Sequence, residues 1–279
     1  MYRWTACLLL FVLLLTGCGL TAEDEAEEAE TKAEREARIQ EMTAEEILKN
    51  VRNAMEEMKG TRWKRVVRHQ FVFKGQPDKN TRVEQKQTVE VTHRPYHLHQ
   101  DGTLTVNQEY VSETIPQRQY VTGKKAYVFK RNQWFESEVD ENGKGFKEDQ
   151  TPLEWLKEVS AFAAGADVKQ KKSQIGITLY PSSSRLKSSI DWTPASLAGI
   201  PANKDTAVAK PVAKVRLWVD KKTFRLVKAE QVVEYTLRLD KQQVNVRQEK
   251  VIRLDGKVNK ISVPEKIRQS AVPVSSSNK

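Results

Sequence analysis

Most of the chain beyond residue 60 alternates apolar and polar side chains with a period of two. In residues 62–73, Trp63, Phe71 and Phe73 alternate with Lys64 and Gln70. Successive side chains of a β-strand point to opposite faces, so the pattern predicts antiparallel strands with one buried and one solvated face. The segments with this pattern are residues 62–73, 82–93, 103–111, 120–139 and 215–254.

The later segments contain turn signals that divide them into neighbouring strands. Residues 120–139 read as two strands, with Gly123-Lys124 and Arg131-Asn132 near the turns, and residues 215–254 read as three. In residues 103–111 the alternation places Leu104, Val106 and Tyr110 on one side.

Two segments have the helical spacing of apolar residues instead. Residues 43–60 begin with Thr43 as N-cap and Glu46 three residues later, which is the capping-box pattern, and they end at Gly60. Residues 151–165 begin with Thr151 as cap and Pro152 at the first helical position. Each helix carries one apolar stripe that must pack against another apolar surface.

The remaining parts lack these patterns. Residues 181–211 are rich in Ser, Pro, Ala and Lys, which predicts a long loop with one short helical turn. The folded domain is expected to span residues 43–267, and residues 268–279 are expected to form a disordered tail.

These elements predict an α+β fold. A large antiparallel sheet of many twisted strands must curl. We therefore expect a curved sheet in which two or more helices cover the concave face.

The N-terminus has the pattern of an export signal. Arg3 precedes a short apolar run, which is shorter than the ~20 residues that a permanent membrane helix needs. Residues 15–18 (LTGC) resemble the bacterial lipobox, which implies that residues 1–17 are a lipoprotein signal peptide and that Cys18 carries a diacylglycerol anchor. The alternative is an ordinary signal peptide or a membrane stub in which Cys18 is incidental.

Charge is distributed unevenly along the mature chain. Residues 18–42 form an acidic, Ala/Glu-rich tether, whose part from residue 19 to residue 40 could reach roughly 70 Å when extended. Residues 59–279 contain 41 basic and 24 acidic side chains. A body this basic is attracted to anionic surfaces, such as lipid headgroups or cell-wall polymers, although the charge could also be solvated without a specific partner. An exported protein rarely meets nucleic acid, so we expect no nucleic-acid partner.

The ordered features together resemble a known superfamily. The lipobox, the helix in residues 43–60, the strands around AYVFKRNQWFE and the strand LWVDKKTFRLVKAE are similar to Gram-positive lipoproteins with a LolA-like fold. That superfamily includes outer-membrane lipoprotein carriers, mycobacterial lipid-binding lipoproteins and regulators of the RseB type. The resemblance covers residues 43–267 and implies an unclosed barrel with helices over a hydrophobic cavity.

A cavity of this kind would be lined by large apolar side chains on the concave face and on the second helix. The alternative is that the same residues fill a solid core. The candidates are Trp63, Phe71, Phe73, Val89, Val91, Tyr110, Leu156, Val159, Phe162, Val233 and Tyr235.

The residues give no catalytic, cofactor or metal signature. Ser182-Ser183-Ser184 lack the setting of a nucleophile, and glycine is too scattered for a phosphate-binding loop. His97 and His99 would lie on the same side of a strand near His93, but no third ligand is obviously placed, so we expect no metal, no cofactor and no enzymatic activity.

Two functions remain open. The first is a lipoprotein on the outer side of the cell membrane, anchored through Cys18, that binds or carries a lipid or the acyl part of a lipoprotein. The second is a regulatory or scaffold lipoprotein that binds another envelope protein.

Overall fold

The computed structural model describes residues 34–139, 151–182, 193–201, 206–239 and 242–274. Contacts divide the chain into two compact units, residues 1–43 and Ala44–Lys279. In the first unit, residues 34–41 are helical. Within the described ranges, no helix combines the length and the apolar character that crossing a membrane requires. Cys18 and the expected signal peptide lie outside the described residues.

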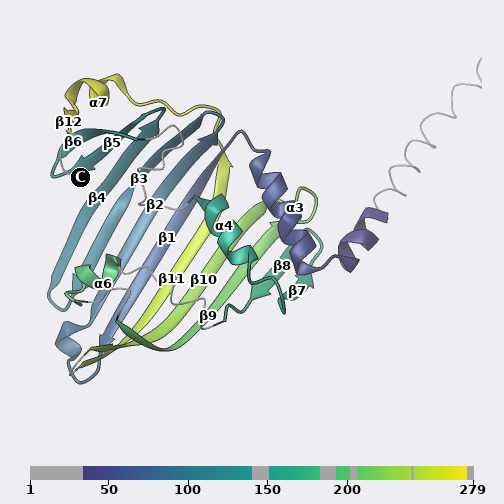
Figure 1. Cartoon of the computed structure of the whole chain (residues 1–279), viewed down its shortest axis with the longest axis horizontal. Coiled ribbons are helices and arrows are strands. Elements are labelled where there is room, and N and C mark those ends of the chain that lie inside the picture. The colour runs from purple at the N-terminus through teal and green to yellow at the C-terminus, as the bar shows by residue number, and fades with distance from the viewer. Residues whose placement is uncertain (1–33, 140–150, 183–192, 202–205, 240–241, 275–279) are drawn as a thin grey trace, which may run out of the picture. The chain divides into compact units, whose positions relative to one another are not determined.

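The second unit is built on one twelve-stranded sheet (Figure 1). Its spatial order is β12-β6-β5-β4-β3-β2-β1-β11-β10-β9-β8-β7, and all neighbours are antiparallel except β12 and β6. In the described part of the chain the end strands β12 and β7 are not paired with each other, so the sheet is unclosed. The strands are β1 (Gly60–Phe73), β2 (Thr81–His93), β3 (Tyr96–Gln108), β4 (Val111–Thr122), β5 (Lys125–Lys130), β6 (Gln133–Glu138), β7 (Asp167–Gln170), β8 (Gln174–Leu179), β9 (Ala207–Asp220), β10 (Leu226–Leu239), β11 (Gln242–Lys257) and β12 (Val272–Pro273).

The turns follow the predicted positions. Gly123, with a φ of 58°, lies between β4 and β5, and Arg131 and Asn132, with φ of 50° and 62°, lie between β5 and β6. Two consecutive residues with positive φ make the tight hairpin turn whose twist matches that of the strands. The three adjacent strands predicted in residues 215–254 are β9, β10 and β11.

Three helices lie over one face of this sheet in Figure 1, and we call that side the inner face. They are α3 (Ala44–Glu56), α4 (Pro152–Ser160) and α6 (Thr193–Leu197). The short helix α7 (Glu265–Ser270) and the single 3₁₀ turn η1 (Pro77–Lys79) complete the described helices. The curved antiparallel sheet with helices on one face confirms the predicted α+β class.

Helix α4 begins as the sequence predicts. The Thr151 hydroxyl accepts a hydrogen bond from the Glu154 backbone N–H at 3.2 Å, and the Glu154 carboxylate accepts one from the Thr151 N–H at 2.8 Å. This reciprocal capping box satisfies two backbone donors at the start of the helix. The helix ends at Ser160 rather than at Gly165, since residues 161–165 form turns.

Two boundaries predicted from composition were wrong. The loop expected to reach Pro211 ends earlier, because β9 begins at Ala207 and pairs with β10 despite its proline. Residues 268–274, expected in a disordered tail, form the end of α7 and the strand β12, which pairs with β6. In both places long-range pairing orders a segment whose local composition is typical of loops.

Candidate functional site

The inner face begins with the odd-numbered residues of β1. Trp63 and Phe71 are each 1% exposed and Phe73 is buried, while Lys64 and Gln70 lie on the opposite, outer face. The Trp63 indole N–H donates to the Thr61 hydroxyl at 2.7 Å, so its polar atom is satisfied inside the protein.

One apolar cluster lies where α6 contacts the sheet, and we call it the α6 cluster. It combines side chains of β1, β2, β9, β10 and β11 with three residues at and after α6. Its buried members are Phe71, Phe73, Val83, Ala195, Ala198, Ile200, Ala213, Val233, Tyr235, Leu237, Val244 and Val246. Because α6 and the residues after it contribute side chains, this part of the inner face is covered by the protein itself.

A second apolar cluster belongs to strands β2 to β5 and the residue after β6, and we call it the β2–β5 cluster. Its buried members are Val89, Val91, Leu98, Val121, Ala126 and Val139, with Tyr96 packed against them. Burial, helped by the nearby Glu154 carboxylate, raises the pKa of the Tyr96 hydroxyl to about 12, so Tyr96 is neutral at any physiological pH.

Helix α4 is held to the sheet by both apolar and polar contacts. Leu156 and Val159 are buried on its inner side. The indole N–H of Trp155 donates to the side-chain carbonyl of Gln231 on β10 at 3.0 Å, and Lys250 Nζ lies 5.5 Å from the centre of the same ring. These contacts fix α4 over β10 and β11.

Between the two clusters, polar side chains cross the inner face from β4 to β1. Arg65 is 6% exposed and donates through Nε to Gln87 Oε1 at 2.8 Å. Gln87 and Gln85 both donate to Gln117 Oε1, at 2.9 and 2.6 Å. Gln119 Nε2 donates to Gln100 Oε1 at 2.7 Å, and these two side chains are also buried.

The same set continues onto β11 and β10. The register pairs His69 with Gln248, and both are buried. Gln248 Nε2 donates to the Tyr235 hydroxyl at 2.8 Å. We call the whole set the polar belt, which consists of Arg65, His69, Gln85, Gln87, Gln100, Gln117, Gln119, Gln231, Gln248 and Lys250.

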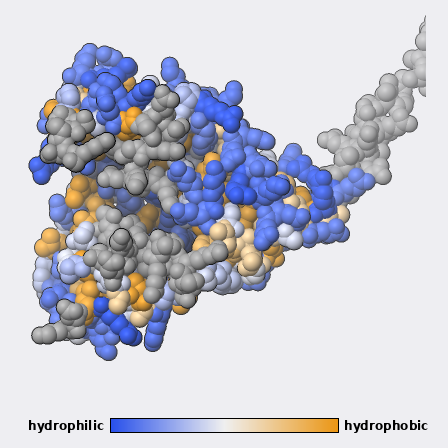
Figure 2. Space-filling model, viewed as in Figure 1, coloured by the Kyte–Doolittle hydropathy of each residue, from blue (hydrophilic) through white to orange (hydrophobic). Residues whose placement is uncertain are grey.

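The polar belt corrects the expectation of a uniformly apolar concave face. Figure 2 shows hydrophobic residues on this side in separate patches among hydrophilic ones. The signal was present in the sequence, because Arg65 and His69 have the same strand parity as Trp63 and Phe71. It was overlooked because only the apolar members of each strand were used to assign the inner side.

The predicted lining residues differ in how far they are buried. Trp63, Phe71, Phe73, Val89, Val91, Leu156, Val159, Val233 and Tyr235 are buried, and Phe162, in the turn after α4, is partly exposed. Phe71, Phe73, Val233 and Tyr235 belong to the α6 cluster, Val89 and Val91 to the β2–β5 cluster, and Leu156 and Val159 to α4, whereas Trp63 on β1 is a member of neither cluster.

Tyr110 was wrongly placed among them. It is 92% exposed in the turn between β3 and β4, next to Glu109, whose φ is 39°. The alternation of Leu104 and Val106 does not continue to Tyr110, because β3 ends at Gln108 and the chain reverses.

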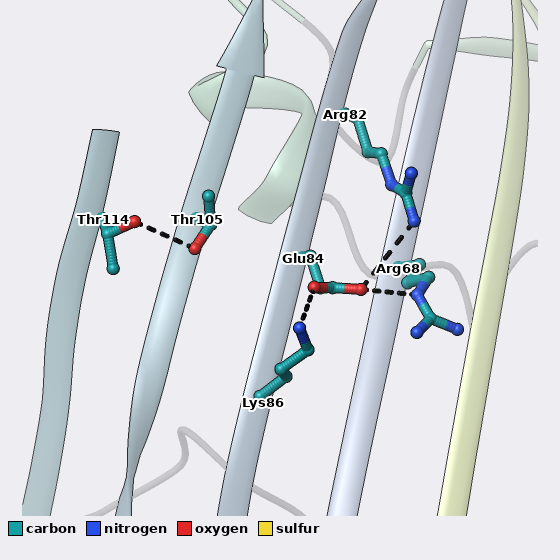
Figure 3. Close-up of polar contacts among 6 residues, drawn as sticks. All are labelled: Arg68, Arg82, Glu84, Lys86, Thr105 and Thr114. Carbon is teal, nitrogen blue, oxygen red and sulfur yellow. Dashed lines mark hydrogen bonds and ion pairs between the residues drawn. The ribbon is translucent and has the colours of Figure 1, made fainter. Parts of the chain in front are cut away.

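The outer face is organised by ion pairs. The Glu84 carboxylate accepts from Arg68 and Lys86, each at 2.6 Å, and lies 3.8 Å from Arg82 (Figure 3). The hydrogen bond from Lys86 and then that from Arg68 lower the pKa of Glu84 despite its partial burial. Solvated faces of this kind contribute to solubility and register.

The histidines of β3 belong to this outer face. His97 and His99 lie on the same side of the strand, as the spacing predicts. The His99 ring stacks on Tyr120 with centroids 4.3 Å apart, and its Nδ1 is 2.8 Å from Glu90. Among the described residues no three metal-ligating side chains converge.

A groove of about 340 Å³ also opens on the outer face, along β1, β11, β10 and β9. Val72 and Val212 give it apolar walls, and Glu234 and Arg247, which form an ion pair, lie at its side. These four side chains have the strand parity of the outer face, although Tyr235 and Val246 of the α6 cluster also line the groove.

Solved structures of similar chains share little sequence with this one. LprF from Mycobacterium bovis is 12% identical, and the match covers 80% of this chain and 96% of that chain with a TM-score of 0.40. A LolA superfamily protein, NE2245 from Nitrosomonas europaea, is 12% identical, with coverages of 81% and 97% and a TM-score of 0.23. A β-barrel-like protein of the domain of unknown function DUF1849 from Brucella abortus is 8% identical, with coverages of 70% and 98% and a TM-score of 0.20. The fold class rests on the architecture itself, an unclosed antiparallel sheet with helices on one face.

No curated protein matches the chain significantly. The model of a family of unknown function, DUF6612, matches residues 43–272, which include every strand of the sheet except the last residue of β12. The chain therefore belongs to the family of unknown function DUF6612.

Proposed function

We propose that this protein is a lipoprotein on the outer side of the cell membrane, anchored through Cys18, whose inner face binds a lipid or an acyl chain. The observation that carries the proposal is the arrangement of two buried apolar clusters on either side of a polar belt that is partly buried, all on one face of a curved sheet. An amphiphile has the same division between hydrocarbon and hydrogen-bonding groups.

The apolar clusters supply the driving force. Burial of hydrocarbon is worth about 25 cal/mol per Å², so one long acyl chain gains on the order of 10 kcal/mol before the costs of ordering it. The β2–β5 cluster is the better candidate for the hydrocarbon, because its described members come from strands and from Val139, whereas α6 already covers the other cluster.

The polar belt supplies the contacts for the polar part of the ligand. A glutamine amide has two N–H donors and one carbonyl acceptor. Within the belt Gln119 donates one N–H to Gln100, and Gln85 donates one to Gln117. Their second N–H groups, with the Arg65 guanidinium, suit the ester, amide or phosphate oxygens of a lipid.

We assign the protein no catalytic activity. The shifted pKa values in the described part have structural causes, such as the lysine beside Glu136 and the burial of Tyr96. These groups belong to surface ion pairs and to the edge of an apolar cluster, rather than to a shared cleft.

Binding is tested by extracting lipid from the native protein. The full-length protein would be purified from its membrane, and its organic extract analysed by mass spectrometry. We expect a co-purified lipid in addition to the covalent anchor, and less of it in Leu98→Ala, which shortens a buried side chain of the β2–β5 cluster. Val212→Ala is the matched control, because Val212 is 64% exposed on the outer face.

Two results would decide against a lipid carrier. Extracts without lipid, or lipid that is lost equally in Leu98→Ala and Val212→Ala, would contradict binding on the inner face. Cross-linking of the lipid-free protein to one envelope protein would then favour the regulatory or scaffold function.

The anchor has a separate test. Cys18→Ser removes the thiol that acylation requires, so we expect the variant to lose metabolic labelling with palmitate and to leave the membrane fraction at high salt, which screens electrostatic attraction to the membrane. Cys7→Ser, which changes the other cysteine of the chain, is the control and should keep both properties. Unchanged labelling of Cys18→Ser would contradict lipidation at this residue.

A further inference from the structure

Two turns at one end of the sheet bring several lysines together. The β7–β8 turn contains Lys171 and Lys172, and the β9–β10 turn contains Lys221 and Lys222. The Lys221 backbone N–H donates to the Ser173 carbonyl at 3.0 Å, so the two turns are in direct contact.

The nearby carboxylate of Asp220 forms hydrogen bonds within the β9–β10 turn. Asp220 Oδ1 accepts hydrogen bonds from the backbone N–H and the hydroxyl of Thr223, both at 2.7 Å. In the part of the chain that the structure describes, Lys171, Lys172 and Lys221 form no ion pair. Lys171 and Lys172 are also exposed, so their charge faces solvent.

The positive charge continues along the outer face from these turns. The strand registers place one residue from each neighbouring strand in a single transverse row. From β7 to β1 the row is Lys169, Gly176, Trp218, Lys228, Arg253 and Lys64. Neighbouring strands lie about 4.8 Å apart, so the row extends over roughly 24 Å.

Acidic neighbours neutralise only part of this row. Lys64 pairs with Asp255 at 2.9 Å, and Lys228 pairs with Glu230 at 2.5 Å. Lys169 and Arg253 are exposed and form no ion pair with a described residue.

An aromatic side chain lies within the same row. Trp218 is partly exposed, with Lys228 Nζ 4.6 Å and Arg216 Cζ 5.8 Å from its ring centre. Tryptophan beside lysine and arginine is the combination found at the headgroup level of membranes.

We propose that this basic end, made of the two turns and the transverse row, is a second membrane contact that binds the anionic headgroups of a lipid bilayer. The contact differs from the anchor at Cys18 and from the inner-face ligand site, and it would orient the sheet relative to the membrane surface. Clustered lysines strengthen binding to anionic lipid surfaces cumulatively, and salt screens the attraction.

The test uses the chain from residue 18 onward with Cys18→Ser, which keeps the whole compact unit and removes the covalent anchor. Its co-sedimentation would be measured with vesicles of phosphatidylcholine alone and of phosphatidylcholine with phosphatidylglycerol. We expect binding only to the anionic vesicles, weakened at high salt, and a loss of at least about tenfold in the combined variant with Lys171→Gln, Lys172→Gln, Lys221→Gln and Lys222→Gln.

A control separates a local site from the effect of net charge. Two double variants, Lys171→Gln with Lys172→Gln and Lys74→Gln with Lys79→Gln, remove the same charge, but Lys74 and Lys79 lie in the connection between β1 and β2. We expect only the first pair to weaken binding, while thermal unfolding confirms that both are folded.

Three outcomes would overturn the proposal. The first is that the parent chain does not bind to anionic vesicles. The second is that the two double variants lose vesicle binding equally. The third is lysine-dependent binding to a soluble phosphate polymer without binding to vesicles. The last would assign the basic end to an anionic wall polymer. Since the test measures neither bound lipid cargo nor acylation of Cys18, its failure leaves the proposed function as it stands.

Discussion

At the scale of single residues, the sheet depends on positions where the backbone leaves no space for a side chain. Gly102 on β3 faces Gln87 of β2 across the polar belt. A Cβ added there would lie 2.1 Å from the Lys86 carbonyl oxygen and 2.8 Å from the Gln87 Cα. These are backbone atoms, so the strands themselves would have to move apart.

We therefore expect Gly102→Ala to lower the free energy of unfolding by about 1–3 kcal/mol, the usual cost of overpacking. Gly176→Ala is the control, because its nearest contact, the Lys169 carbonyl oxygen, is at an ordinary 3.6 Å. Urea denaturation of both variants checks the difference. Equal stabilities would show that β2 and β3 are not held as closely as the structure indicates.

A second single-residue effect depends on pH. The pKa of Glu84 is lowered in the folded protein, first by the hydrogen bond from Lys86. A carboxyl whose folded pKa is lowered stabilises the protein above its unfolded pKa, near 4.5, and this contribution is lost as the pH falls through the folded pKa.

Glu84→Gln should therefore be less stable than the parent at pH 7, by up to about 1 kcal/mol because the pair is near the surface, and the difference should vanish in acid. Chemical denaturation across this pH range measures it. Glu113→Gln, on an exposed part of β4, is the control for the loss of a carboxylate from the outer face. A difference for Glu84→Gln that persists in acid would mean that charge is not its cause.

At the scale of elements, α4 shows how a short helix is fixed before it packs. Its nine residues are too few for stability in isolation. The capping box of Thr151 and Glu154 starts the helix, and Leu156, Val159 and the Trp155–Gln231 hydrogen bond attach it to the sheet.

Thr151→Ala removes the capping hydroxyl and should lower the free energy of unfolding by about 0.5–2 kcal/mol. Thr151→Ser keeps a hydroxyl at the same position and should retain most of the stability. Thermal unfolding compares the two variants. If both lose the same amount, the methyl group of Thr151, which is buried, matters more than the cap.

At the scale of the whole molecule, the two faces of one sheet carry different kinds of side chain. The outer face holds the ion pairs and the basic end, and the inner face holds the apolar clusters and the polar belt. This division follows from the period of two, because every strand carries both patterns at once.

The arrangement of the inner face also predicts which substitutions should change lipid binding. Gln119→Leu replaces a belt amide with an apolar group of similar size, and it leaves the Gln100 carbonyl without its donor. If the polar belt binds the polar part of a ligand, Gln119→Leu should change which lipids co-purify, whereas Leu98→Ala should reduce the amount of co-purified lipid. An unchanged lipid profile in a folded Gln119→Leu variant would assign the belt a purely structural role.

The sequence by itself determined the local structure, which includes several turns and the start of α4. Period-two alternation predicted the strands. The residue types at Gly123 and Arg131–Asn132 predicted the turns, where the backbone has positive φ. Thr151 and Glu154 predicted the start of α4. These features depend on neighbours a few residues apart, which the chain order already specifies.

Only the tertiary structure decided which strands are neighbours and what therefore meets on each face. The polar belt is assembled from side chains of six strands, and the basic end from two turns about 50 residues apart in sequence. The pairing of β12 with β6, and the pairing of β9 with β10 on both sides of Pro211, depend on partners far away in the chain. Hydrogen bonds between distant strands have no local signal, so the strand pairing that creates both proposed sites is visible only in the folded molecule.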